Sequence, residues 1–154
     1  MTDSALSSAR RTLAAEIDGL QALSHALGDN FEQAATMLAG ISGRVIVSGM
    51  GKSGHIGSKI AATMASTGTP AQFVHPGEAS HGDLGMITSN DAVLALSWSG
   101  ETAELANLID YAKRFSIPLI ALTSGADSLL GRQADICITL PKSTEACPNG
   151  LAPT

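Results

Sequence analysis

The sequence has few aromatic and few charged residues, and these shortages exclude two classes of protein. Aromatic residues make up 3% of the 154 residues, charged residues make up 15%, and the formal net charge is −5. A nucleic-acid-binding protein is not expected, because it needs a basic face and aromatic side chains for stacking. A disordered chain is not expected either, because only 15% of the residues are charged. The composition predicts one compact domain, with part of its surface covered by another copy of the chain.

Cysteines and long apolar runs are also scarce. The two cysteines, Cys137 and Cys147, are too few for a disulfide framework and lack the spacing of metal ligands. The N-terminus carries neither the apolar core of a signal peptide nor a run of about 18 apolar residues that could span a membrane. The sequence therefore predicts a cytoplasmic protein with reduced thiols.

The apolar residues that are present change their spacing near residue 44. Before it they recur every three or four positions, which predicts a long helix over residues 4–27 and a short second helix with one apolar face. That face consists of Phe31, Ala34, Ala35 and Leu38. After it, helical patterns alternate with five apolar runs that predict strands: Arg44–Ser48, Ala71–His75, Ala92–Ser97, Leu119–Thr123 and Ile136–Leu140. This order predicts an α/β three-layer sandwich with a five-stranded parallel sheet over residues 44–154, on which the helices of residues 1–43 pack.

In such a sheet, ligands bind beyond the carboxyl ends of the strands. The rule selects four loops: Gly49–Gly54, Pro76–Gly85, Trp98–Thr102 and Ser124–Asp127. The candidate site residues are expected in these loops.

The first loop is a glycine-rich turn that contains Lys52 and leads into a helix. It is not a mononucleotide-binding loop, because Ile46 stands where that motif needs its first glycine. It has the glycine spacing of a dinucleotide-binding turn, but no acidic residue ends the second strand to bind a ribose. Glycines that only allow the strand and helix to pack tightly would explain Gly49 and Gly57, but not Lys52. The turn is predicted to meet an anion.

The third loop places three hydroxyl groups around a predicted helix start, on Ser97, Ser99 and Thr102, with Gly100 between them. Hydroxyls and free backbone N–H groups at a helix N-terminus can bind phosphate oxygens. The alternative is that Ser99 or Thr102 only caps the helix. Because one hydroxyl would suffice for a cap, anion binding is favoured.

Candidate acids and bases stand near these loops. Glu101 and Glu104 are expected to share a face in the first turns of one helix, where at least one of them would serve as an ordinary partner of the helix dipole. The loop after the second strand adds His75, Glu78, His81 and Asp83. Their spacing fits no standard zinc site, whereas His81 could transfer protons. Glu145, after the last strand, could reach the same edge of the sheet.

Four segments together resemble the sugar isomerase (SIS) domain of D-arabinose 5-phosphate isomerases: Gly49–Gly57, His75–Gly85, Ser99–Thr102 and Glu145–Pro148. The S-G-E-T loop alone would mark any SIS domain, whereas the lysine–histidine turn and the E-A-C-P segment together point to this subfamily. The resemblance implies a flavodoxin-like SIS fold. It also implies interconversion of D-arabinose 5-phosphate and D-ribulose 5-phosphate through an enediol, which supplies the lipopolysaccharide sugar Kdo. Family members assemble as homotetramers and use neither a cofactor nor a metal.

The resemblance implies roles for single residues as well. The catalytic lysine of the family matches Lys52, its two catalytic glutamates match Glu104 and Glu145, and a histidine that lines the site matches His81. The substrate and its phosphate are expected to contact Gly51, Ser53, Ser97, Ser99, Gly100 and Thr102.

The sequence departs from the family at Trp98 and at its end. Trp98 stands where the family usually has a small polar residue. The catalytic histidine of the family and its two CBS domains would follow residue 154, so a shortened chain that retains binding is expected, with its full turnover in doubt. The alternative function is a non-catalytic, phosphosugar-binding regulatory SIS domain, which would need the hydroxyl loop but not Lys52 and the two glutamates.

Overall fold

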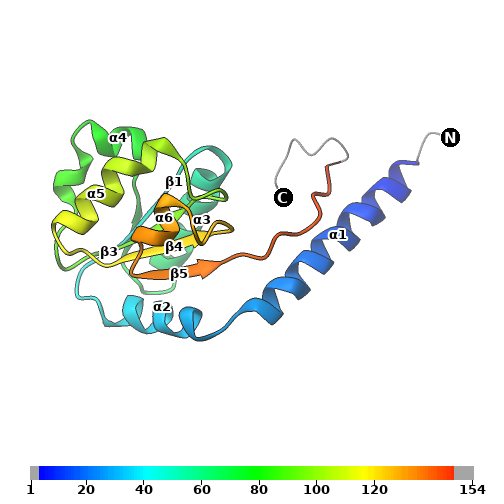
Figure 1. The fold of residues 1–154 in the computed structure, drawn as a ribbon, viewed down its shortest axis with the longest axis horizontal. Helices are drawn as coiled ribbons and strands as arrows, with labels where there is room; N and C mark the ends of the chain where they lie inside the picture. The colour runs from blue at the N-terminus through cyan, green and yellow to red at the C-terminus, as the bar shows by residue number, and fades with distance from the viewer. Residues whose placement is uncertain (1–3, 148–154) are drawn as a thin grey trace. The chain divides into compact units, whose positions relative to one another are not determined.

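The structure, a computed structural model, describes residues 4–147 and divides into two compact units. One unit spans residues 28–139 and holds the sheet. The other contains α1 (Ala5–Ala26) and the segment after the last strand (Figure 1). No helix in the described part of the chain is long and apolar enough to cross a bilayer. The boundary at residue 43 stays a prediction.

Five parallel strands form one sheet in the order β2-β1-β3-β4-β5. They are β1 (Val45–Gly49), β2 (Ala71–Phe73), β3 (Ala92–Leu96), β4 (Leu119–Thr123) and β5 (Ile136–Thr139). The five predicted strands are confirmed, with small differences at their ends. Both β1 and β3 are buried along their whole length. Strands covered on both faces read as unbroken apolar runs, which is why periodicity located them.

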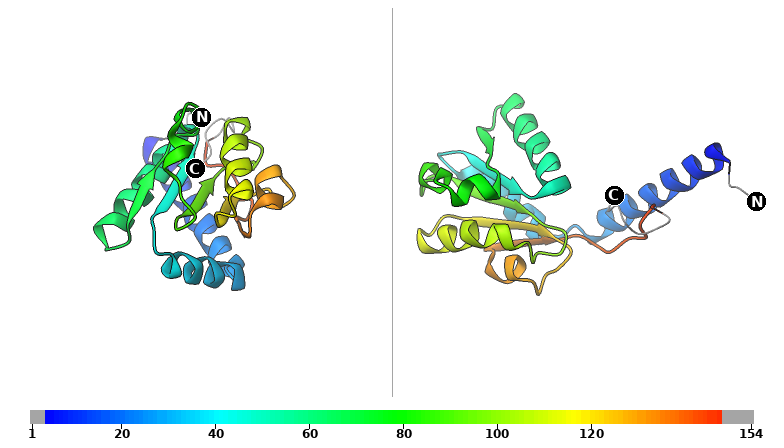
Figure 2. Two further views of the ribbon diagram at one scale, coloured as in Figure 1. Left: turned by 90° about the vertical axis from the view of Figure 1, so that its left-hand side faces the viewer. Right: turned by 90° about the horizontal axis from the view of Figure 1, so that it is seen from above.

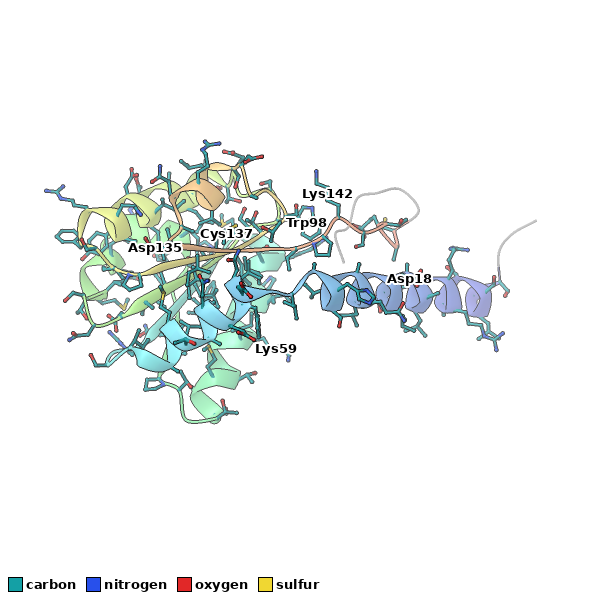
Figure 3. All side chains as sticks on the ribbon, turned by 60° about the horizontal axis from the view of Figure 1, so that its bottom comes forward. Asp18, Lys59, Trp98, Asp135, Cys137 and Lys142 are labelled. Carbon is teal, nitrogen blue, oxygen red and sulfur yellow. The ribbon has the colours of Figure 1, made fainter. Side chains whose placement is uncertain are left out.

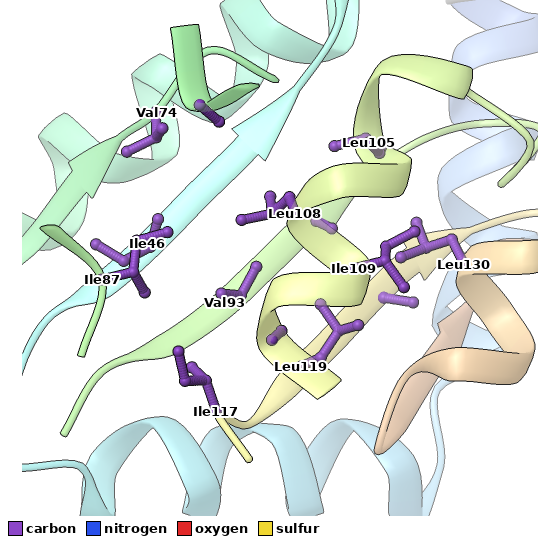
Figure 4. Close-up of a cluster of buried hydrophobic side chains, with 14 residues drawn as sticks. Ile46, Val74, Ile87, Val93, Leu105, Leu108, Ile109, Ile117, Leu119 and Leu130 are labelled. Atoms are coloured by element: carbon purple, nitrogen blue, oxygen red, sulfur yellow. The ribbon is translucent and has the colours of Figure 1, made fainter. Parts of the chain in front are cut away.

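Helices connect the strands and cover both faces of the sheet. They are α2 (Asp29–Gly40), α3 (Gly51–Ser66), α4 (Pro76–Ser80), α5 (Ala106–Arg114) and α6 (Leu129–Gln133), with 3₁₀ turns η1 (Asp83–Met86) and η2 (Ala103–Leu105). Because successive strand residues point to opposite faces, Ile46 packs in one core cluster with Leu108 of α5, shown in Figure 4. Its neighbour Val47 packs in the second cluster with Ala61 of α3. Figure 2 shows α3 and α5 on opposite sides of the sheet, so the predicted three-layer sandwich is confirmed.

The second helix, α2, lies where it was predicted but buries only part of its predicted apolar face. Ala34 is 3% exposed and packs in the core with Met37 and Leu38. Phe31 is 49% exposed and Ala35 is also exposed, so these two residues of the predicted apolar face stay open to solvent. The helix packs with the face that carries positions 34, 37 and 38, and positions 31 and 35 lie outside it.

The first helix, α1, is confirmed, but none of its residues is buried. The Ser4 hydroxyl caps it by accepting the N–H of Ser7 at 3.1 Å. Leu13, Ile17 and Leu20 are 58%, 54% and 66% exposed. Their spacing places them on one apolar stripe, which the described chain leaves uncovered.

The buried carboxylate of Asp91 fastens the amino-terminal edge of the sheet. Its Oδ1 accepts the N–H of Arg44 at 2.6 Å, and its Oδ2 accepts the N–H and the hydroxyl of Thr88 at 2.8 and 3.0 Å. Burial by itself raises the pKa of Asp91. The hydrogen bonds from Thr88 and Arg44 and the charge of Arg44 outweigh burial, so the pKa lies below its ordinary value. One carboxylate thereby ties the starts of β1 and β3 to the turn before β3.

Candidate functional site

The connections after β1 and β3 leave the sheet in opposite directions. These two strands are neighbours, but α3 follows β1 on one face, whereas η2 and α5 follow β3 on the other. Such a switch point, beyond the carboxyl ends of the strands, is where α/β proteins bind ligands. The glycine-rich turn and the hydroxyl loop start from these two strands, so the fold brings both to the switch point.

The loop predicted over Gly49–Gly54 is shorter in the structure, because α3 already begins at Gly51. Gly51 adopts a left-handed φ of 56°, and Lys52, in the first turn of α3, is exposed. A Cβ on Gly49 would lie 3.0 Å from the Leu96 carbonyl, and one on Gly57 would lie 3.2 Å from Val47. Close packing therefore accounts for Gly49 and Gly57, as the alternative interpretation held, and leaves Lys52 unexplained by packing.

The first turn of α3 offers backbone donors beside this lysine. Ser53 is half-buried, and the first hydrogen bond of the helix runs from the N–H of Gly54 to the carbonyl of Met50. In the described chain, the N–H groups of Gly51, Lys52 and Ser53 donate to no other group. The helix dipole adds to the attraction that these donors exert on an anion.

The hydroxyl groups of the third loop are partly used within the loop itself. Ser97 is 3% exposed; its hydroxyl lies 2.8 Å from that of Thr102 and accepts the N–H of Gly100 at 3.0 Å. The Ser99 hydroxyl accepts the N–H of Glu101 at 3.2 Å. Ser99 therefore closes a turn within the loop and does not cap the helix, and the Thr102 hydroxyl caps no N–H of the helix either.

Several backbone donors of this loop remain available within the described residues. Within residues 4–147, the N–H groups of Ser99, Thr102 and Ala103 donate to no other group. Ser99 lies in the loop, whereas Thr102 and Ala103 lie at the start of η2. Together with the exposed hydroxyl of Ser99, they form a set of donors that an oxyanion could accept from.

The two glutamates near this loop do not share a helix face, which corrects the prediction. Glu101 precedes η2, and its Oε1 accepts the N–H of Leu129 at the start of α6 at 2.9 Å. Glu104 lies within η2 and is exposed. Only Glu104 therefore remains as a carboxylate of the helix start.

A loop was predicted after β2, but this segment folds into α4 and η1. His75 caps α4, since its Nδ1 accepts the N–H of Gly77 at 3.2 Å, whereas His81 follows α4 and is exposed. In residues 4–147, no group of three or more His, Cys, Asp or Glu side chains is arranged to hold a metal. Glu145 is half-buried and belongs to the unit that contains α1, so its role stays a prediction.

The sequence reasoning missed two residues that support the hydroxyl loop. Thr123 and Ser124, at the end of β4, donate hydrogen bonds to the backbone carbonyl of Trp98. The available signal was the pair of hydroxyl residues at a strand end. The Trp98 side chain is 43% exposed and lies at the carboxyl end of the sheet, whereas Asp135 marks the opposite end (Figure 3).

Comparisons with known proteins agree on one family. Residues 37–154 match the model of the SIS domain. The arabinose 5-phosphate isomerase KdsD of Pseudomonas aeruginosa is 53% identical over 147 residues, and that of Yersinia pestis is 55% identical over 147 residues. A solved structure of E. coli CFT073 c3406 in complex with A5P superposes with a TM-score of 0.84 at 38% identity, covering 94% of this chain and 77% of that one.

The two KdsD relatives are longer than this chain. The matches cover 96% and 94% of the chain but only 45% and 44% of the relatives. The chain thus spans less than half of their length.

Proposed function

The chain belongs to the SIS domain family, and from this membership we propose that it is the isomerase domain of an enzyme that interconverts D-arabinose 5-phosphate and D-ribulose 5-phosphate. The observation that carries the proposal is the meeting of Lys52 and the hydroxyl loop at one switch point of the sheet. A lysine, two carboxylates and unused N–H donors are proposed to supply both the acid–base groups and the anion site that this reaction needs.

The phosphate of the sugar is proposed to bind the loop Ser97–Thr102. The free N–H groups of Ser99, Thr102 and Ala103 and the Ser99 hydroxyl support this assignment. The buried Ser97 hydroxyl is proposed to contribute through its contact with Thr102. Gly51, Ser53 and Gly100 are proposed to let the backbone approach the substrate.

The chemical step moves a carbonyl group from C1 to C2 of the open-chain sugar. A base removes the C2 proton, an enediol or enediolate forms, and a proton is delivered to C1. Glu145 or His81 is proposed to move the carbon-bound proton. The Lys52 ammonium is proposed to stabilise the negative oxygen of the intermediate, and Glu104 is proposed to assist proton transfer between the oxygens or opening of the sugar ring.

Self-association is proposed as well, in the form of a homotetramer. The uncovered stripe of Leu13, Ile17 and Leu20 on α1 supports association, because soluble proteins rarely leave a contiguous apolar surface open to water. The proposed setting is the cytoplasm, where the product would enter Kdo synthesis.

The test is an isotope experiment on the chain extended beyond residue 154. D-arabinose 5-phosphate is incubated with the protein in deuterium oxide, and ketose formation and deuterium at C1 and C2 are followed by NMR. Turnover is expected in the wild type, and Glu145→Gln is expected to abolish most of it while sugar-phosphate binding persists. Glu32→Gln, on the exposed first turn of α2, is the control. Binding without exchange in the wild type would favour the non-catalytic sensor, and neither binding nor exchange would exclude both functions.

A further inference from the structure

The hydroxyl loop is held in place by residues 123–130, which run from the last residue of β4 into the start of α6. The carbonyl of Trp98 accepts three hydrogen bonds: from the N–H and hydroxyl of Ser124 at 2.9 and 2.8 Å, and from the hydroxyl of Thr123 at 3.2 Å. The carbonyl of Gly100 accepts the N–H of Leu130 at 3.0 Å. The Trp98–Ser99 and Gly100–Glu101 peptide groups are thereby fixed.

Thr123 is the buried centre of this support. It is 0% exposed, and its hydroxyl both donates to the Trp98 carbonyl and accepts the N–H of Gly125 at 3.1 Å. A Cβ on Gly100 would lie 3.0 Å from the same hydroxyl and would overlap the side chain of Ser128. The two loops are therefore packed with no room between them.

Glu101 supplies the second side-chain link. Its carboxylate accepts the N–H of Leu129 at 2.9 Å, one of the backbone donors that a helix start leaves without a partner. This bond draws the negative charge toward α6. It accounts for an acidic residue inside a loop that is expected to bind an anion.

We propose that Thr123 and Glu101 are positioning residues of the phosphate site. The location of that site rests on the proposed function. They hold residues 98–101 so that the N–H groups of Ser99, Thr102 and Ala103 stay available to the ligand. Donors that are fixed before binding need no ordering when the phosphate arrives, which raises affinity. Neither side chain has to touch the ligand.

The test compares paired variants by titration calorimetry with inorganic phosphate and with D-arabinose 5-phosphate. Thr123→Val removes the hydroxyl at nearly constant volume, and Thr123→Ser keeps it. Glu101→Ala removes the acceptor, and Glu101→Gln keeps an acceptor without the charge. Thr139→Val is the matched control, because Thr139 pairs with Thr123 in register but is exposed at the end of β5.

Thr123→Val and Glu101→Ala are expected to weaken both ligands about tenfold, the effect of one lost hydrogen bond. Thr123→Ser, Glu101→Gln and Thr139→Val are expected to stay within about threefold of the wild type. If Thr123→Val does not fold, the two variants of the exposed Glu101 decide the question.

Two outcomes would overturn the inference: wild-type phosphate affinity in Glu101→Ala, or an equal loss in Glu101→Ala and Glu101→Gln. The isomerase proposal fails by a different result, the absence of deuterium exchange in the extended wild-type chain when that chain still binds phosphate. A wild-type chain that binds neither ligand would overturn both.

Discussion

Replacing Asp91 by Asn, far from the proposed site, is expected to destabilise the protein by about 1.5–3 kcal/mol at pH 7. The asparagine oxygen can still accept the N–H of Arg44, but its NH₂ group would face the two Thr88 donors that Oδ2 now accepts. A hydrogen bond to a charged group contributes about 1.5–3 kcal/mol, so two such bonds amount to about 3–6 kcal/mol. Because Thr88 is exposed, water can satisfy its donors and recover roughly half of this. Arg44 adds little, since its Nε lies 3.9 Å from Oδ1 and its side chain is 41% exposed.

The pH dependence of this effect separates a charge contribution from a packing contribution. The pKa of Asp91 is lowered in the folded protein, so the carboxylate stabilises the fold above the unfolded-state value of about 3.9. This stability is lost as the pH falls through the lower folded-state pKa. The difference between wild type and Asp91→Asn is therefore expected to be constant between pH 5 and 7 and to shrink below about pH 4.

Urea unfolding followed by circular dichroism, with an unchanged m value, measures the difference at each pH. Asp110→Asn is the matched control, because Asp110 is exposed on α5 and its carboxylate accepts no hydrogen bond within the described residues. The reasoning is refuted if Asp91→Asn is as stable as Asp110→Asn. It is also refuted if the difference stays constant or grows from pH 5 to pH 3.

Three further substitutions test the packing, the loop and the surface. Leu108→Ala, at a residue that is 0% exposed between α5 and the sheet, is expected to lower the free energy of unfolding by about 3–5 kcal/mol through lost burial and a cavity, as measured by urea unfolding. Gly100→Ala is expected to weaken phosphate binding by at least about tenfold in calorimetry, because its φ of 72° disfavours a side chain and the new Cβ would overlap Ser128. Wild-type affinity in that variant would contradict the loop geometry. Lys113→Ala is expected to change the free energy of unfolding by less than about 0.5 kcal/mol, because its 3.3 Å ion pair with Asp135 joins side chains that are 44% and 42% exposed. A larger change would contradict the view that this ion pair is a weak surface contact.

The fold was largely predictable because its signals are local. Unbroken apolar runs located the five strands, and the alternation with helical periods indicated parallel pairing. The face of α2 was not predictable in full. Phe31 and Ala35 match the helical period as well as Ala34 does, and only packing on the sheet decides which apolar positions are covered.

The candidate site was predictable in its members but not in their surroundings. The motif around Lys52 and the hydroxyl loop are contiguous in sequence, so their residue types could be interpreted directly. Glu101 accepts a hydrogen bond from Leu129, 28 residues later in the chain, and the Trp98 carbonyl accepts one from Ser124, 26 residues later. Such pairs have no periodic signature, since they depend on how two loops meet at one edge of the sheet.

The sequence by itself determined the strands, their alternation with helices and hence their parallel pairing, and the residue types at the strand ends. Each of these follows from spacing along a single stretch of chain, where backbone geometry fixes which side chains share a face. Only the tertiary structure decided that Glu101 turns toward α6, that Thr123 supports the hydroxyl loop, and that Asp91 fastens the opposite edge. These are hydrogen bonds between distant segments, and their geometry exists only once the sheet has brought those segments together.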